Sequence, residues 1–230
     1  MQYLFEGIAK ALSLISSLDP EVLSAVWVSL RTSVTAIAFA SLIGVPIGFL
    51  VATHNFRGKR PVVLLLNTLM ALPTVVVGLI VYSFLSRQGP LGPLGLLYTP
   101  SAMVVGQFIL ATPIVAALTL TAVQGIDPRV RQTAVTLGAN RLQLAMTMTS
   151  EARFAITAAI IAGFGRIIAE VGSAMMLGGN IRGYTRTMTT TIALETSKGE
   201  FALGIALGVI LLIVAFTVNI LFQALQRRGI

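Results

Sequence analysis

The sequence predicts an all-α integral membrane protein with five transmembrane helices and an N-terminal helix in the membrane interface. Of its 230 residues, 56% are hydrophobic and only 10% are charged, whereas soluble domains carry about 25% charged residues. Four uncharged runs can each cross a bilayer once, because a spanning helix needs about 20 apolar residues. The runs are 32–53, 61–86, 101–126 and 201–226. A fifth segment, 154–181, is apolar apart from Arg166 and Glu170.

Residues 1–20 predict an amphipathic helix that lies in the outer interface. Its apolar residues recur at helical spacing and are Leu4, Phe5, Ile8, Leu12, Ile15 and Leu18. The polar residues of the opposite face are Glu6, Lys10, Ser13 and Ser17. No secretory signal peptide is expected, because a basic start followed by an apolar core is missing. Asp19-Pro20-Glu21 then predicts a helix start, with an N-cap, a proline and an acid in order.

Residues 21–230 predict one transmembrane domain, because no linker divides them. Pro46, Pro73 and Pro113 lie inside the predicted spans, where each removes a backbone hydrogen bond and favours a kink. Two pairs of glycines at i and i+4 favour close packing between helices. The pairs are Gly44 with Gly48, and Gly204 with Gly208.

The distribution of Lys and Arg predicts the orientation. With the N-terminus outside and the C-terminus cytoplasmic, the inner segments hold nine of these residues and the outer segments hold five. The location expected is therefore a prokaryotic cell (inner) membrane, crossed several times. The net charge of +8 is explained by inner loops that face anionic headgroups, rather than by nucleic acid.

The composition argues against an enzyme. Without Cys, thiol catalysis and thiolate metal sites are excluded, and the single His, His54, stands at an inner helix end. A phosphate-binding G-x-x-x-x-G-K-[ST] motif is absent. We therefore expect no catalytic residue, no metal site and no cofactor in this chain.

The largest inner segment, about 124–153, predicts a short helix that projects below the membrane. Asp127-Pro128 predicts its start, and Gly138 and Asn140 suit its end because both tolerate left-handed backbone. A second helix is expected to lead into the fourth span. A partner protein can bind such a helix in a cleft and transmit rigid-body motion to the transmembrane helices. The candidate residues are Arg131, Gln132, Thr133, Ala134, Gly138, Ala139 and Arg141.

This segment resembles the cytoplasmic loop of the permease subunits of small type I ATP-binding cassette (ABC) importers, which has the pattern E-A-A-x-x-x-G. Gln132-Thr133-Ala134 stands at E-A-A and Gly138 at the glycine. Gln replaces the acid and Thr replaces the first Ala. The stretches NTLMALPTVVVGLIVY (67–82) and AEVGSAMMLGGNIRGYTRTMTTTIALETSKGEF (169–201) resemble the oxyanion permeases for molybdate, sulfate and especially tungstate.

The resemblance implies the type I ABC importer permease fold and a transport role. Two copies of the chain would form a pore, and two ATPase subunits would dock on the loops at 131–142. An extracytoplasmic tungstate- or oxyanion-binding protein would deliver the anion. ATP and Mg²⁺ would bind in the partner ATPase subunits.

The candidate pathway residues lie mainly in the polar stretch 178–198. Hydroxyls, amides and guanidinium groups suit a tetrahedral oxyanion because they donate hydrogen bonds. The candidates are Arg166, Glu170, Asn180, Arg182, Thr185, Arg186, Thr187 and Thr189. The alternative for the outer stretch is a connection that caps helices or docks the binding protein.

Arg166 and Glu170 stand one helical turn apart, and we expect a structural or gate-forming ion pair. Arg166→Ala alone should then harm assembly or transport more than Arg166→Ala with Glu170→Ala.

Other functions remain open at this level. A molybdate, sulfate or phosphate importer permease would share these features. A stand-alone anion channel or secondary transporter would move substrate without an ATPase, and a membrane enzyme is disfavoured by the scarcity of His, Cys and paired acids.

Overall fold

The computed structural model describes the backbone of residues 2–228 and the side chains of residues 5–221 and 224. Within these residues the chain is helical, with no strand. The helices are α1 (Gln2–Ser16), α2 (Pro20–Thr53), α3 (Lys59–Met70), α4 (Thr74–Leu85), the 3₁₀ turn η1 (Gly92–Leu94), α5 (Pro100–Gln124), α6 (Pro128–Thr136), α7 (Arg141–Glu151), α8 (Arg153–Ile168), α9 (Gly172–Gly178), α10 (Met188–Ser197) and α11 (Phe201–Arg228).

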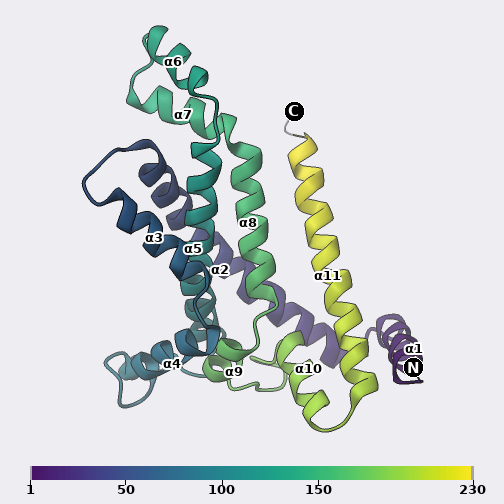
Figure 1. Cartoon of the computed structure of the whole chain (residues 1–230). Coiled ribbons are helices and arrows are strands. Elements are labelled where there is room, and N and C mark those ends of the chain that lie inside the picture. The colour runs from purple at the N-terminus through teal and green to yellow at the C-terminus, as the bar shows by residue number, and fades with distance from the viewer. Residues whose placement is uncertain (1, 229–230) are drawn as a thin grey trace.

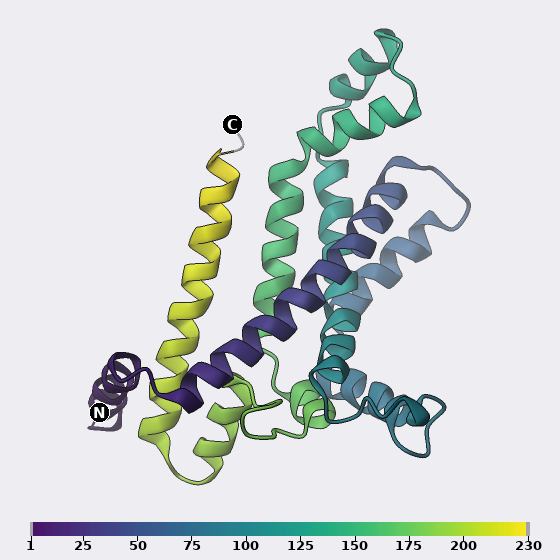
Figure 2. The same ribbon diagram turned by 180° about the vertical axis from the view of Figure 1, so that it is seen from behind.

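Three predicted spans are single helices long and apolar enough to cross a membrane: α2, α5 and α11. The predicted start of α2 is confirmed, because the Asp19 carboxylate accepts the N–H groups of Glu21 and Val22 at 2.9 and 3.1 Å. Its 34 residues make it about 51 Å long. This exceeds the bilayer core of about 30 Å, and α2 runs obliquely past the steeper helices (Figure 2).

The other two predicted spans are bent helix pairs. The segment 61–86 divides into α3 and α4, which meet at 96°. Pro73 stands at this break, as expected of a residue that lacks an N–H and disfavours helical backbone at Leu72. Pro46 and Pro113, in contrast, lie inside the continuous helices α2 and α5.

The segment 154–181 divides into α8 and α9, which meet at 63°. Two buried side chains bind the backbone at this break. The Gln107 amide donates to the Ile167 carbonyl at 3.4 Å, and the Glu170 carboxylate accepts the Ser173 N–H at 3.0 Å. Backbone groups freed by a broken helix in an apolar setting need such partners.

The core is built around α5, the most buried of the three long helices. α2 packs closely along α5 because Gly44 and Gly48 present no side chain to it. A Cβ on Gly48 would lie 2.8 Å from the Thr119 Cβ and 3.0 Å from the Leu120 nitrogen. The second predicted pair packs less: Gly204 faces the Thr196 hydroxyl, but Gly208 has nothing within 4 Å.

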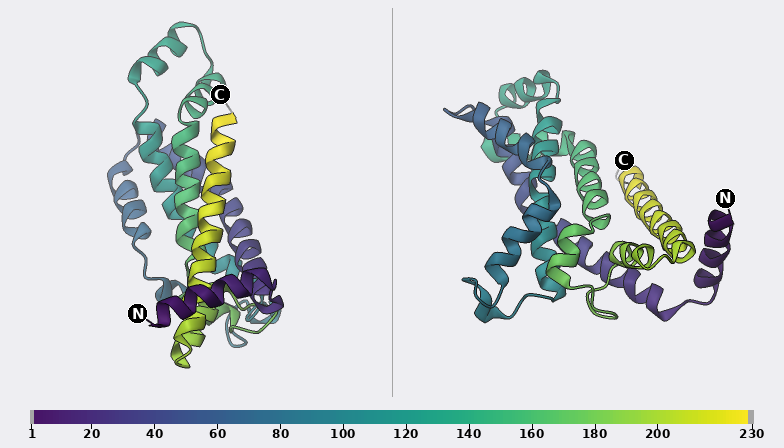
Figure 3. Two further views of the ribbon diagram at one scale, coloured as in Figure 1. Left: turned by 90° about the vertical axis from the view of Figure 1, so that its right-hand side faces the viewer. Right: turned by 60° about the horizontal axis from the view of Figure 1, so that its bottom comes forward.

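The helical body has two different ends (Figure 1). The α6–α7 pair projects from one end, and α4, α9 and α10 gather at the other. α1 crosses α11 at this second end (Figure 3), where Gly7 meets Ile205. Phe5 and Leu12 of α1 remain 72% and 65% exposed, as expected of an apolar face turned to lipid. The side chains of Leu4, Arg227 and Arg228 lie outside the described residues.

Candidate functional site

The projecting loop contains the two helices that the sequence predicts. Asp127 caps α6, since its carboxylate accepts the Arg129 N–H at 2.9 Å. Gly138 ends α6 in left-handed backbone, with φ of 81°. Asn140 differs from expectation: its φ is −71°, and it begins α7 instead of ending α6. A reciprocal pair of hydrogen bonds with Gln143, at 2.8 and 2.9 Å, explains this role.

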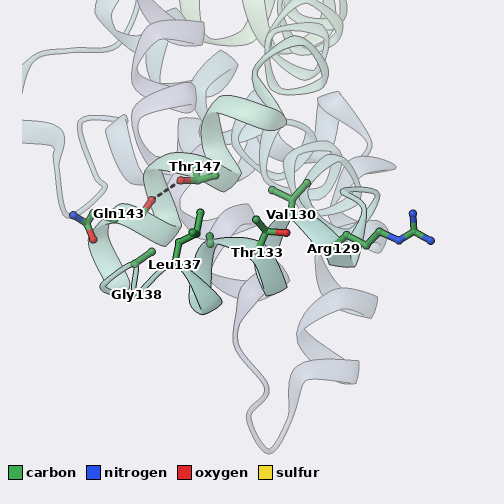
Figure 4. Close-up of a pocket in the computed structure, with 9 residues that line it drawn as sticks. Arg129, Val130, Thr133, Leu137, Gly138, Gln143 and Thr147 are labelled. Atoms are coloured by element: carbon green, nitrogen blue, oxygen red, sulfur yellow. Dashed lines mark hydrogen bonds between the residues drawn. The ribbon is translucent and has the colours of Figure 1, made fainter.

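A hollow of about 680 Å³ lies between α6 and α7. Thr133, Ala134, Gly138 and Ala139 of the predicted set line it together with Leu137 (Figure 4). Leu137 is 82% exposed, and Val135 is 56% exposed. Arg129 extends away from the other labelled side chains (Figure 4). The loop therefore presents an apolar tip and a hollow at the end of the molecule.

The remaining predicted loop residues lie elsewhere. Arg131 and Arg141 line a separate hollow beside His54, at the end of α2. Gln132 is exposed and lines neither of these two hollows. The carbonyl of Gln132 accepts the Thr136 hydroxyl at 2.9 Å.

Arg166 and Glu170 form the expected ion pair, with an N–O distance of 3.2 Å. The two partners differ in burial: the Arg166 side chain is 45% exposed and that of Glu170 is 3% exposed. Glu170 also joins two further elements. Its carboxylate accepts the Ser173 N–H, and its carbonyl accepts the Thr189 hydroxyl at 2.8 Å.

The predicted threonines are buried, and their hydroxyls bind within the protein. Thr185 donates to the Gly178 carbonyl and accepts the Ile181 N–H at 3.0 Å. Thr187 caps α10 by accepting the Thr190 N–H at 3.2 Å. In this conformation the hydroxyls of Thr185 and Thr187 stabilise the connection between α9 and α10 and the start of α10.

Arg182 and Arg186 share one carboxylate, that of Glu21 at the start of α2, at 2.7 and 2.8 Å. This pairing ties the turn before α10 to a residue more than 160 positions earlier. Asn180 adopts left-handed backbone, with φ of 51°. Its buried Oδ1 has no hydrogen-bond partner among the described residues.

Two residues that contribute to these contacts were not predicted as site residues. In the sequence, Glu21 has only the features of a favourable first-turn acid, and Gln107 is only a polar residue in an apolar run. Among the described residues, no three or more His, Cys, Asp and Glu side chains gather where they could hold a metal ion.

Comparison with known proteins identifies what this arrangement resembles. Residues 44–229 match the family model described as "Binding-protein-dependent transport system inner membrane component". The chain is 39% identical over 228 residues to the "Tungstate uptake system permease protein TupB" of Peptoclostridium acidaminophilum, covering 99% of this chain and 100% of that protein. The protein of the same name from Campylobacter jejuni is 44% identical over 227 residues, covering 99% and 95%.

The chain is also similar to a more distant permease and to a solved transporter structure. The "Molybdenum transport system permease protein ModB" of Escherichia coli (strain K12) is 29% identical over 192 residues, covering 79% of this chain and 83% of that protein. Among solved structures, a chain of the MetNI methionine ABC transporter in an inward-facing conformation superposes with a TM-score of 0.76. The superposition covers 92% of this chain and 97% of that chain at 18% identity. At this identity the match indicates a shared fold only.

Proposed function

Because the chain belongs to the family of binding-protein-dependent transport system inner membrane components, we propose that it is the permease subunit of an ATP-driven tungstate importer. The observation that carries this proposal is the similarity to two tungstate permeases along 99% of the chain. The chain is a multi-pass membrane transport component, and the hydrolytic chemistry belongs to its partners. ATP and Mg²⁺ bind in separate ATPase subunits, and an extracytoplasmic binding protein delivers the oxyanion.

The α6–α7 pair is the coupling loop on which the ATPase subunits dock. An 82% exposed Leu137 at the tip of a projecting loop gains free energy when a partner covers it. The loop can also carry force. Buried Ala152 alone separates α7 from α8, so a push on α7 is transmitted to the bent α8–α9 pair.

Two copies of the chain form the translocation pore, with α8 at their interface. One face of α8 carries a stripe of exposed small residues at helical spacing, which continues past Arg166 to Ala169 just after the end of α8. The exposed small residues are Ala155, Ala158, Ala162, Gly165 and Ala169. Small residues mark helix interfaces in membranes, and a half-exposed arginine in a span faces water or another subunit. A helix face that contacts lipid carries large apolar side chains instead, such as the exposed Leu212 and Phe216 of α11.

The orientation follows from the same assignment. The coupling loop and the C-terminus are cytoplasmic, and α1 lies outside in the interface. Glu170 and Arg166 then stand near the outer end of the pore, where the α8–α9 bend can act as a gate. Arg182 and Arg186 remain candidates for guiding the anion if their contact with Glu21 opens.

The test is ATP-driven uptake by the chain reconstituted in liposomes with its ATPase and binding protein. Tungstate should stimulate ATP hydrolysis and enter the liposomes, whereas sulfate should not. Leu137→Asp should abolish coupling, because a carboxylate at the apolar tip opposes docking. Thr149→Ala, an exposed change on the same loop, should leave transport unchanged.

Three outcomes would contradict the proposal. Uptake without any ATPase would identify a channel or secondary transporter. Stimulation by molybdate or sulfate and not by tungstate would change the cargo while keeping the subunit's role. Full coupling by the Leu137→Asp variant would remove the α6–α7 tip as the docking site.

A further inference from the structure

A second hollow on the cytoplasmic end, of about 360 Å³, is lined by basic side chains from three elements. His54 comes from the end of α2, Arg131 from α6 and Arg141 from the first turn of α7. No acidic residue lines this basic hollow, and it shares no lining residue with the hollow between α6 and α7. Its positive charge is therefore not balanced from within.

The two arginines have no carboxylate partner among the described residues, whose ion pairs are made by Arg166, Arg182, Arg186 and Lys198. His54 is anchored through Nδ1, which lies 3.2 Å from the Leu50 carbonyl. The same nitrogen lies 3.1 Å from the Thr53 hydroxyl, so both contacts hold the imidazole at the rim of the hollow through Nδ1. The two guanidinium groups that line this hollow repel each other, and an anion bound between them would relieve that repulsion.

The other wall of the basic hollow is apolar. It is formed by Phe49 of α2 together with Leu144, Ala145 and Met148 of α7. Phe49 belongs to the membrane-spanning part of α2, so the hollow extends from the apolar span to the basic loop. A small bare anion gains nothing from such a wall, whereas a lipid places its glycerol and acyl carbons there.

We propose that the basic hollow binds a tetrahedral oxyanion group, and that its occupant is the phosphate of an anionic phospholipid. Guanidinium groups bind phosphate oxygens with paired hydrogen bonds. Basic pockets on the cytoplasmic side of membrane proteins suit anionic headgroups. The bound lipid would connect α2 to the coupling loop, so the loop's position would depend on the composition of the inner leaflet.

The test measures lipid retention by the full chain purified in detergent, with native mass spectrometry. Phosphatidylglycerol is compared with phosphatidylcholine, which carries the same phosphate diester but no net charge. The wild type should retain phosphatidylglycerol in preference. Arg131→Gln with Arg141→Gln should weaken this retention by about tenfold, since each arginine near an anionic headgroup adds to its binding.

Arg57→Gln with Arg60→Gln is the matched control, because it removes the same charge from two exposed positions outside the hollow, one in the α2–α3 loop and one in the first turn of α3. It should retain the lipid. The single variant Arg141→Gln, at an exposed position, should show a smaller loss in the same direction and repeats the test with less risk to folding. Arg131→Lys with Arg141→Lys should restore part of the preference for phosphatidylglycerol. Lysine supplies the positive charge but not the paired hydrogen bonds of a planar guanidinium group.

Three further results would overturn the proposal. Equal loss in the control and the Gln variants would mean that surface charge in general attracts the lipid. Displacement of the lipid by millimolar tungstate or inorganic phosphate would identify a site for the free oxyanion instead. The absence of any preference for phosphatidylglycerol in the wild type would refute the site altogether. The comparison of phosphatidylglycerol with phosphatidylcholine needs neither the ATPase nor the binding protein, so its outcome is separable from the importer assignment.

Discussion

At the scale of single residues, Glu170 connects three parts of the structure. Its carboxylate binds Arg166 and the Ser173 N–H, and its carbonyl accepts the Thr189 hydroxyl. A buried carboxylate needs such partners, because its transfer from water is costly without them. The residue therefore stabilises the bend between α8 and α9 and its contact with α10.

The structure sharpens the test of the Arg166–Glu170 pair. Arg166→Ala leaves the buried carboxylate with one N–H donor and should lower stability by about 1–2 kcal/mol, less than a fully buried pair because Arg166 is half exposed. Adding Glu170→Gln removes the stranded charge but keeps an acceptor for Ser173. Thermal unfolding in detergent should therefore show partial recovery in the double variant. Equal melting of the single and double variants would refute the pair's structural role.

Glu21 should protect the turn before α10 from proteolysis. Glu21→Gln releases Arg182 and Arg186, so trypsin should cleave after these residues about two- to fivefold faster, in keeping with a partly exposed ion pair. Cleavage is followed by mass spectrometry of the fragments. Glu200→Gln, whose exposed carboxylate is in no described ion pair, serves as the control. Unchanged cleavage in Glu21→Gln would mean that the threonine hydrogen bonds alone secure this turn.

At the scale of elements, the closeness of α2 and α5 depends on glycine. The sequence predicts close packing from the spacing of Gly44 and Gly48, and the structure places both against the α5 backbone. The same spacing at Gly204 and Gly208 produces one close contact and one open position. A spacing of four residues marks a helix face, but only the arrangement of the partner helix decides whether that face is used.

Gly48→Ala should destabilise the protein, whereas Gly208→Ala should not. The new methyl group at 48 meets α5 backbone atoms, which cannot move aside as a side chain would, so overpacking should cost about 1–3 kcal/mol. The melting temperature in detergent should fall for Gly48→Ala and stay within error for Gly208→Ala. The reverse order would contradict the observed packing of α2 on α5.

At the scale of the whole molecule, the α6–α7 pair lies at one end of the helical body, and α4, α9 and α10 lie at the other (Figure 1). The α6–α7 pair continues into α8 with only Ala152 between α7 and α8, and α8 ends at the bend held by Glu170. In the importer that we propose, motion of the α6–α7 pair therefore has a short mechanical route to the opposite end of the body. The exposed small-residue stripe on α8 lies along this route, which is why we place the second copy there.

Cross-linking tests the proposed interface between two copies of the chain. The chain has no Cys, so Ala162→Cys introduces a single thiol per copy, on the exposed stripe of α8. A short bismaleimide should join two such chains in membranes. Leu212→Cys, 69% exposed on α11, should give little dimer. Efficient cross-linking at 212 and none at 162 would move the interface to α11.

Much of the candidate site was predictable because its signals are local. Asp127, Gly138 and the one-turn spacing of Arg166 and Glu170 each act on neighbours within four or five residues, so the sequence alone predicts a projecting helix and an ion pair. The threonines between 185 and 189 were predicted as polar but not as buried. Their burial depends on contacts with distant elements, as in the bond from Thr189 to Glu170.

The sequence by itself determined the protein's class, its apolar segments, the ends of several helices and its resemblance to oxyanion permeases. These properties follow from composition, hydrophobic length and short-range capping, which need no knowledge of the partner helices. Only the tertiary structure decided that Glu21 binds Arg182 and Arg186, that Gln107 satisfies a broken helix, and that His54 shares a hollow with Arg131 and Arg141. Such contacts join residues far apart in the chain, and their geometry exists only once the helices have packed.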